Sequence, residues 1–422
     1  MQTATHKKRI KLYIPQMSYE AARVTAAAFQ SIGFDAQPSP HSDTRTLELG
    51  AQYLSGEECL PEKITLGNFL KAMEAPDFDP EYTGFLMPTA GGPCRFGQYR
   101  PLFQKILKEM KLPQVRIFSP TSSDGYEGFG DEAKHLFHTM WIALIAGDIL
   151  RKLHLKTRPY EIEKGSANAL FQCCLDDICN VLAEPTTNMR SKRQKLKAVL
   201  IDVRDKYRAL PADYSNPRPL IGIVGEIYCR LNEFSNNFLV EKIEEFGGEA
   251  WMSDVIEWGW YTNDEQRWKL DKAGKRISLD MLKVKIKQWV MHRDEKYLMA
   301  PLVQDFNGYE EPRHVHEVLE LSRPYLPRES ALGEMVLNVG KSIYLYNKGA
   351  DGIVDISPFS CMNGIVCEVV YPQVSKAHNN FPIRSFYFDG NQSELDRDVG
   401  IFMELAKNYM RKKTVIRKFP SL

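Results

Sequence analysis

The chain lacks an excess of charge of either sign, and it lacks a long apolar run. Among its 422 residues, 55 are Lys or Arg and 54 are Asp or Glu, so no bulk positive field attracts nucleic acid or anionic membrane. The most apolar stretch, residues 140–147, is too short to span a bilayer, and the basic start is not followed by the apolar segment of a secretory signal. We therefore expect a cytoplasmic protein that binds neither nucleic acid nor membrane.

The sequence also lacks any C-x-x-C pair, although it contains eight cysteines. This absence argues against a zinc ribbon and against a thioredoxin-type redox pair, because both depend on closely spaced cysteines. Cysteines of a large cytosolic chain stay reduced, so metal binding or catalysis is a better explanation for them than disulfides. A metal site in this chain would have to be assembled from distant segments.

Two groups of apolar segments alternate with helical patterns and predict parallel sheets. The first group comprises residues 9–15, 34–37, 82–89 and 115–120, and the second comprises residues 220–226, 249–252, 352–356 and 384–388. Between the first two segments of the second group, a helix is predicted over residues 234–246. The sequence thus predicts an α/β protein with two Rossmann-like domains and helical insertions. The first domain is expected over residues 1–125, a mainly helical segment over 126–217, and the second domain over 218–422 with a helical insertion at 257–325.

Three cysteines share one local pattern: Cys59, Cys94 and Cys361 each lie in a loop with Gly or Pro nearby, and each loop leads into a predicted helix. Outward-pointing N–H groups and the helix dipole at such a place favour the thiolate. Because sites form beyond the carboxyl ends of parallel strands, we expect the three sulfurs to meet between the two domains and to bind an iron–sulfur cluster. One alternative is a zinc site formed by the same thiolates. The other is that a given cysteine binds no metal and simply packs as a small buried side chain.

Two neighbouring residues are candidates for a catalytic role. Glu58 could act as a fourth ligand or as a proton donor, and the alternative is a solvated loop acid. Arg95 could balance the charge of an anionic cluster or bind an anionic substrate group, and the alternative is a surface ion pair. Glu226, in a Gly turn, either faces the site or serves as a helix dipole partner. The other five cysteines are expected to pack in helices and are Cys173, Cys174, Cys179, Cys229 and Cys367.

The segments GEECLP at 56–61, GPCRFGQY at 92–99 and SPFSCMNG at 357–364 together resemble the acyl-CoA dehydratase activase-related family. That family is similar to the 2-hydroxyacyl-CoA dehydratase subunits and to the double-cubane-cluster reductases. The resemblance covers most of the chain and is most specific around Cys94. The chain departs from the family pattern at Asn363, where a proline usually follows the Cys-Met pair.

The resemblance implies a Rossmann-like fold with a low-potential iron–sulfur cluster, expected to be a four-iron cluster, with a double-cubane cluster as the alternative. It also implies electron delivery by an ATP-dependent activase of the actin-like ATPase class. Since the chain has no G-x-x-x-x-G-K-[ST] loop and no ATPase half that we recognise, this activase is expected to be a separate partner. The implied function is the reduction or dehydration of a small substrate in a homo- or heterodimer, and the alternative is a non-catalytic electron relay or scaffold.

Overall fold

The fold is described from a computed structural model, which covers residues 9–89, 91–92, 94–119, 133–185, 188–329, 331, 333–391 and 395–419. Side chains within these ranges are described from residue 135 onward in the helix that begins at Ala133. The expected boundary between residues 125 and 126 lies outside these ranges. Within them, the structure contains no helix that is both long and apolar enough to cross a membrane.

The first sheet is parallel and has four strands in the order β2-β1-β3-β4. Its strands are β1 (Lys11–Ile14), β2 (Asp35–Pro38), β3 (Thr83–Leu86) and β4 (Arg116–Phe118). The helices in this part of the chain are α1 (Tyr19–Gln30), α2 (Thr44–Ala51), α3 (Leu60–Met73) and α4 (Phe96–Glu109). All four residues of β3 are buried, as expected for a central strand covered by helices on both faces.

The second sheet repeats the same arrangement, with four parallel strands in the order β6-β5-β7-β8. Its strands are β5 (Leu220–Gly225), β6 (Glu249–Met252), β7 (Gly352–Pro358) and β8 (Ile383–Phe388). Its helices are α8 (Ile227–Leu231), α9 (Leu239–Glu245), α13 (Glu334–Asn347), α14 (Met362–Ala377) and α15 (Leu395–Lys412). The α/β class with two parallel sheets is therefore confirmed.

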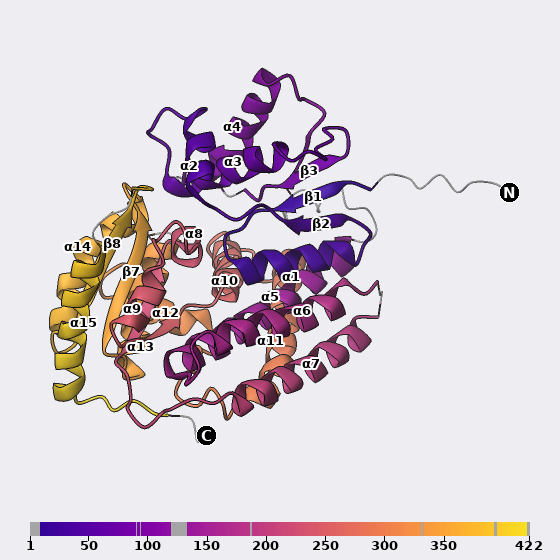
Figure 1. Cartoon of the computed structure of the whole chain (residues 1–422). Helices are drawn as coiled ribbons and strands as arrows, with labels where there is room; N and C mark the ends of the chain where they lie inside the picture. Colours follow the sequence, from indigo (N-terminus) through magenta and orange to yellow (C-terminus); the bar gives the residue numbers. More distant parts are fainter. Residues whose placement is uncertain are drawn as a thin grey trace.

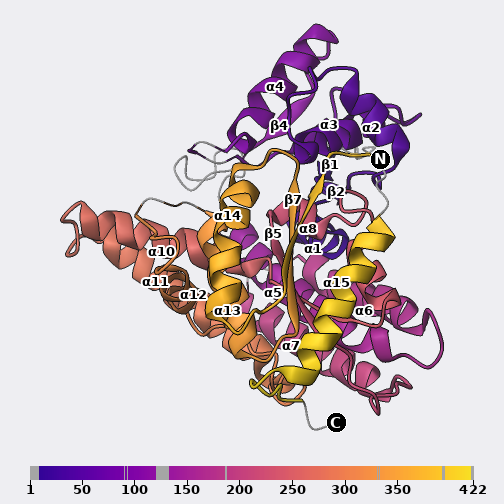
Figure 2. The same ribbon diagram turned by 90° about the vertical axis from the view of Figure 1, so that its left-hand side faces the viewer.

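Two helical segments complete the fold. The first contains α5 (Ala133–Thr157), the 3-10 turn η2 (Arg158–Tyr160), α6 (Ser166–Ala183) and α7 (Met189–Ala209). The second contains α10 (Ile256–Lys272), α11 (Leu279–Met299), η3 (Ala300–Leu302) and α12 (Val315–Ser322). Figure 1 shows the first sheet above the second sheet and the helical segments, and Figure 2 shows α10 and α11 extending away from the body.

The long helix α5 joins the two halves of the molecule. It packs against α1 of the first half and against β6 of the second, and one apolar cluster contains Val24, Leu150 and Trp251 from these three elements. Burial of such side chains is the main source of stability, at roughly 1.5–3 kcal/mol for each large apolar side chain. This continuous cluster holds α1 and β6 against α5.

Two local features differ from the sequence-based expectations. Helix α2 was not expected, although Asp43 and Thr46 form a capping box at its start. The helix expected over 234–246 is shorter, because Asn237 and Phe238 have φ of 53° and 57° and interrupt any helix there. Asn236 stabilises this turn, since its side-chain oxygen accepts a hydrogen bond from the Leu239 N–H at 3.1 Å.

Candidate functional site

Cys59 lies at the start of α3, where it is the N-cap residue without making a side-chain cap. Its Sγ lies 2.8 Å from the hydroxyl oxygen of Tyr99, which is buried on α4. Arg95, at the start of α4, donates a hydrogen bond to the carbonyl oxygen of Glu57. These two contacts hold the Cys59 loop against the helix that follows Cys94.

Cys94 and Cys361 also precede helices, as the sequence predicts. Cys94 is exposed and lies two residues before α4, whereas Cys361 is half-buried and is the N-cap residue of α14. Ser360, directly before Cys361, has a left-handed backbone with φ of 63°. That conformation is unfavourable for a serine, so the turn after β7 stores strain next to the thiol.

The three thiols share carboxylate neighbours although they are distant in the sequence. The charge of Glu226 acts on Cys59, Cys94 and Cys361, and the charge of Glu334 acts on Cys94 and Cys361. Glu226 follows β5 and Glu334 begins α13, so both belong to the second half of the molecule. The fold thus brings loops from both halves to one carboxylate pair.

The ionisation of the thiols differs from the expectation that the helix starts favour thiolates. Burial, supplemented by the Glu226 charge, raises the pKa of Cys59 to about 11 and that of Cys361 to about 12. Burial, again with help from the two carboxylates, also raises the pKa of Cys94. Backbone N–H groups oppose these shifts but do not reverse them. The metal-free thiols are therefore protonated at neutral pH, which corrects the prediction of a thiolate bias.

The carboxylate pair is held by backbone and side-chain donors. Glu226 caps α8, because its side chain accepts hydrogen bonds from the N–H groups of Tyr228 and Cys229 at 3.0 and 2.7 Å. Glu334 accepts from the Ile227 N–H at 2.8 Å and from the side-chain amide of Asn363 at 3.1 Å. Burial raises the pKa of both acids, and with the Glu226 charge it raises that of Glu334 to about 8. The pair can thus hold a proton close to the thiols at neutral pH.

Of the two residues predicted to be catalytic, Glu58 has structural contacts within its own loop, whereas Arg95 bonds the Glu57 carbonyl of that loop from the start of α4. Glu58 accepts hydrogen bonds from the Ser55 N–H and the Gly56 N–H at 3.2 and 3.0 Å. Although burial opposes the shift, these donors lower the pKa of Glu58, so this side chain is ionised and suits ligation better than proton donation. Glu334 is better suited than Glu58 to hold and donate a proton. The sequence distinguishes it only as an acid in the first turn of a helix.

The remaining cysteines lie in helices. Cys174, Cys179, Cys229 and Cys367 are buried, whereas Cys173 on α6 is exposed. Within the part of the chain that the structure describes, no three His, Cys, Asp or Glu side chains are grouped so as to hold a metal ion. Glu226 is a common neighbour of the three candidate thiols, and Glu334 is a neighbour of Cys94 and Cys361 only.

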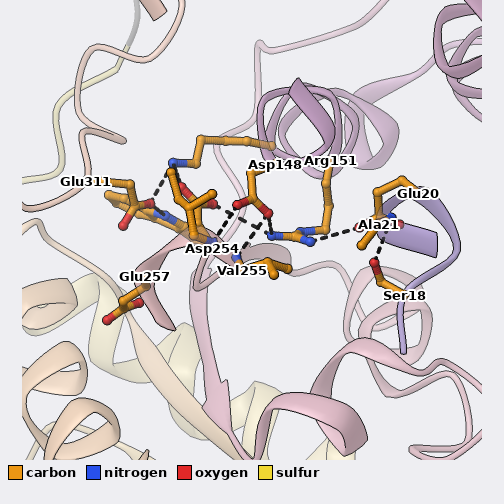
Figure 3. A network of polar contacts seen from close by, with 12 residues as sticks. Ser18, Glu20, Ala21, Asp148, Arg151, Asp254, Val255, Glu257 and Glu311 are labelled. Carbon is orange, nitrogen blue, oxygen red and sulfur yellow. Dashed lines mark hydrogen bonds and ion pairs between the residues drawn. The ribbon is translucent and has the colours of Figure 1, made fainter. Parts of the chain in front are cut away.

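A buried network of charged side chains also connects elements of both halves (Figure 3). Arg151 on α5 pairs with Glu20 on α1 at 2.8 Å and with Asp148. Asp148 in turn accepts hydrogen bonds from the N–H groups of Val255 and Ile256 at 3.0 and 2.9 Å. The network thereby fixes the start of α10 against α5 and α1.

Comparison with protein-family models and with curated proteins finds no match for the chain.

Proposed function

We propose that the chain is an iron–sulfur redox protein, with Cys59, Cys94 and Cys361 as the cluster ligands. One observation carries this proposal: three loop cysteines from distant parts of the chain all have Glu226 as a charged neighbour. Electrons would come from a separate ATP-dependent activase of the actin-like ATPase class, and the substrate would be a small molecule that is reduced or dehydrated. This assignment follows the family that the three cysteine motifs resemble.

The donor chemistry fits such a group. Thiolates are the usual ligands of iron–sulfur clusters, and a four-iron cluster binds each thiolate through a different iron. It therefore separates its ligands more widely than a single zinc ion does. When bound, the cluster would supply one-electron chemistry at low potential. The open iron of a cluster held by three cysteines would be available to Glu58, water or substrate.

The surrounding residues have defined roles in this proposal. Tyr99 orients Cys59 through the contact between its hydroxyl and Sγ, and Arg95 holds the Cys59 loop in place. The Glu226 and Glu334 carboxyls carry negative charge or a proton beside the thiols, depending on pH. Because negative charge near a cluster opposes its reduction, these acids would lower the reduction potential when they are ionised.

Anaerobic purification with iron, sulfide and spectroscopic analysis tests the proposal. We expect a brown protein with about four irons per chain, or about eight for a double-cubane cluster. Cys59→Ser, Cys94→Ser and Cys361→Ser should each reduce the iron content, since each removes one thiolate. Cys229→Ser and Cys173→Ser are matched controls, because neither residue is a proposed ligand, and both should retain the iron.

An iron-free, colourless protein from anaerobic cells would contradict the proposal. Stoichiometric zinc that is lost on the same three substitutions would instead show that the thiolates form a zinc site. Iron loss in Cys173→Ser as well as in the three ligand variants would indicate general destabilisation rather than ligation.

A non-catalytic electron relay is the second candidate, and the surface beside Cys361 favours it. Phe359, Met362, Ile365 and Val369 on α14 and the preceding loop are exposed apolar side chains, with Phe359 and Val369 at 68% and 73% exposure. An apolar face next to the proposed cluster is suited to docking another redox protein. Under this alternative the cluster is reduced by the activase, but no small substrate is consumed without an additional subunit.

A further inference from the structure

Helices α10 and α11 form an arm that extends away from the body of the molecule (Figure 2). One face of α11 packs inward, where Met281, Val284 and Met291 are buried. The opposite face carries a row of apolar side chains that are 53–77% exposed, which we call the apolar seam: Leu279, Leu282, Ile286 and Trp289. Helix α11 is therefore apolar on two faces, and the described part of the chain covers only one of them.

The turn at the tip of the arm adds another exposed apolar side chain. Ile277 directly precedes Ser278, the N-cap residue of α11, whose side chain accepts a hydrogen bond from the Met281 N–H at 3.1 Å. A hydrophobic residue before the N-cap often packs against the fourth residue of the helix, which is Leu282 here. Ile277 is instead fully exposed and makes no such contact. The apolar surface of the arm thus continues from the seam to the tip.

The spacing of the seam fits a single partner helix. Its members follow one another after three, four and three residues, which is the spacing of the a and d positions in a coiled-coil repeat. Such a strip is narrower than the face that a helix turns towards a protein core, and one other helix can cover it. From Leu279 to Trp289 the seam is about 15 Å long, at a rise of about 1.5 Å per residue.

The arm also carries a local excess of positive charge. Residues 269–288 contain seven Lys or Arg and two Asp or Glu, although the whole chain has a net charge of only +1. Both acids already lie near a cation, since Asp280 is 3.6 Å from Lys283. Asp271 is likewise 3.8 Å from Arg276. In the described part of the chain, the cations of this segment with no carboxylate oxygen within 4.0 Å are Lys272, Lys275, Lys285 and Lys287.

The positions of the lysines select the charge of the partner. With Leu279 at position a, Lys283 and Lys285 occupy the e and g positions that border the seam on its two sides. Charges at these positions decide which helices pair, because carboxylates opposite the lysines attract and ammonium groups repel. A second copy of the chain docked seam to seam would bring like charges together. The seam therefore fits an acidic helix and disfavours its own copy.

We infer that the apolar seam binds an acidic amphipathic helix of another protein, with apolar residues at its a and d positions and Glu or Asp at its e and g positions. Burial of the seam supplies the apolar part of the binding energy, and the flanking lysines supply the selectivity. The inference is independent of the proposed cluster, because Cys59, Cys94 and Cys361 lie on neither α10 nor α11.

Fluorescence anisotropy of a labelled synthetic peptide, titrated with the full chain, tests the inference. The probe is a peptide of three heptads with Ile at a, Leu at d and Glu at e and g, and the control peptide has Lys at e and g. We expect saturable binding of one acidic peptide per chain, weakened by added KCl because the flanking ion pairs are exposed. The lysine peptide should bind at least about tenfold more weakly, because its charges face Lys283 and Lys285.

Substitutions in the seam separate it from other exposed apolar residues. Ile286→Ser should weaken binding of the acidic peptide by about tenfold, because it removes one apolar side chain from the middle of the seam. Ile401→Ser on α15 is the matched control, since Ile401 is 53% exposed against 54% for Ile286, and peptide affinity should be unchanged. Replacing both flanking lysines, Lys283→Glu with Lys285→Glu, should reverse the preference, so that the lysine peptide binds more tightly than the acidic one.

The inference is wrong if the wild-type chain binds neither peptide or binds both equally. A wild-type dimer in sedimentation equilibrium that Ile286→Ser abolishes would also overturn it, because a second copy would then occupy the seam. Binding to phosphatidylserine–phosphatidylcholine vesicles that is lost in Ile286→Ser, without binding of the acidic peptide, would identify the seam as a membrane contact instead. Equal loss of affinity in Ile286→Ser and Ile401→Ser would likewise contradict the position assigned to the site.

Discussion

The Cys59 Sγ atom and the Tyr99 hydroxyl oxygen lie 2.8 Å apart, and this hydrogen bond joins one proposed cluster loop to the helix that follows another. This contact connects the start of α3 with α4, which directly follows the Cys94 loop. Burial is the larger influence on Cys59 and raises its pKa, whereas the Tyr99 hydrogen bond lowers it. The tyrosine therefore affects both the position and the ionisation of the thiol.

We predict that Tyr99→Phe slows the alkylation of Cys59 in the metal-free protein. Loss of the hydroxyl removes the hydrogen bond that stabilises the thiolate, so its population at a given pH should fall several-fold. Iodoacetamide labelling between pH 8 and 10, followed by mass spectrometry, measures the rate at each cysteine. Cys94 is the internal control and should react at an unchanged rate. Equal Cys59 rates in the two proteins would contradict the role assigned to Tyr99.

The buried acid Glu334 should make the metal-free chain less stable as pH rises. Its folded pKa of about 8 lies above its ordinary value of 4.5, so the folded state binds the extra proton between these limits. The free energy of unfolding should consequently fall with increasing pH through this window, by up to about 1.4 kcal/mol per pH unit for this group.

Glu334→Gln should make this pH dependence less steep, because glutamine keeps an acceptor for the Ile227 N–H but does not titrate. Urea unfolding of both proteins at pH 5, 6, 7 and 8 provides the comparison. Other buried acids, including Glu226, still contribute to the slope of the variant. An unchanged slope in Glu334→Gln would show that the proton is held elsewhere.

Gly225→Ala should strongly destabilise the second sheet. Gly225 has φ of 127°, and an added Cβ would lie 2.0 Å from the Ile356 carbonyl oxygen of β7. Strain and displacement of the strands should reduce the free energy of unfolding by about 2–4 kcal/mol and move Glu226 away from the thiols. Gly91→Ala is the control, because its Cβ would meet no atom of the described residues within 4 Å, and its unfolding transition should match the wild type. Urea unfolding of the two variants checks the difference.

Asp148→Asn should cost about 3–5 kcal/mol of stability, because it leaves the buried Arg151 with a weakened partner. The same carboxylate also accepts two backbone hydrogen bonds at the start of α10, of which asparagine can satisfy only part. Asp176→Asn offers a matched comparison: Asp176 pairs with Arg23 at 2.6 Å but is 59% exposed, so its loss should cost less than about 1 kcal/mol. Similar destabilisation by both substitutions in urea unfolding would disprove the distinction.

Much of the fold follows from local sequence patterns. Apolar segments such as residues 220–226 and 249–252 predict strands that the structure confirms as β5 and β6, since short buried parallel strands have a continuous apolar character. The prediction failed at residues 234–246, where two non-glycine residues adopt left-handed conformations. The side-chain hydrogen bonds that stabilise this turn involve Asn236 and partners in both directions along the chain, which a helical pattern does not reveal.

By itself, the sequence determined that Cys59, Cys94 and Cys361 lie at or just before helix starts, because turn residues and apolar periodicity are local properties. Only the tertiary structure decided that Glu226 becomes a neighbour of all three and Glu334 a neighbour of Cys94 and Cys361, and that the protonated thiol is favoured at each. Burial and through-space charge depend on which distant segments pack together, and no spacing along the chain specifies them.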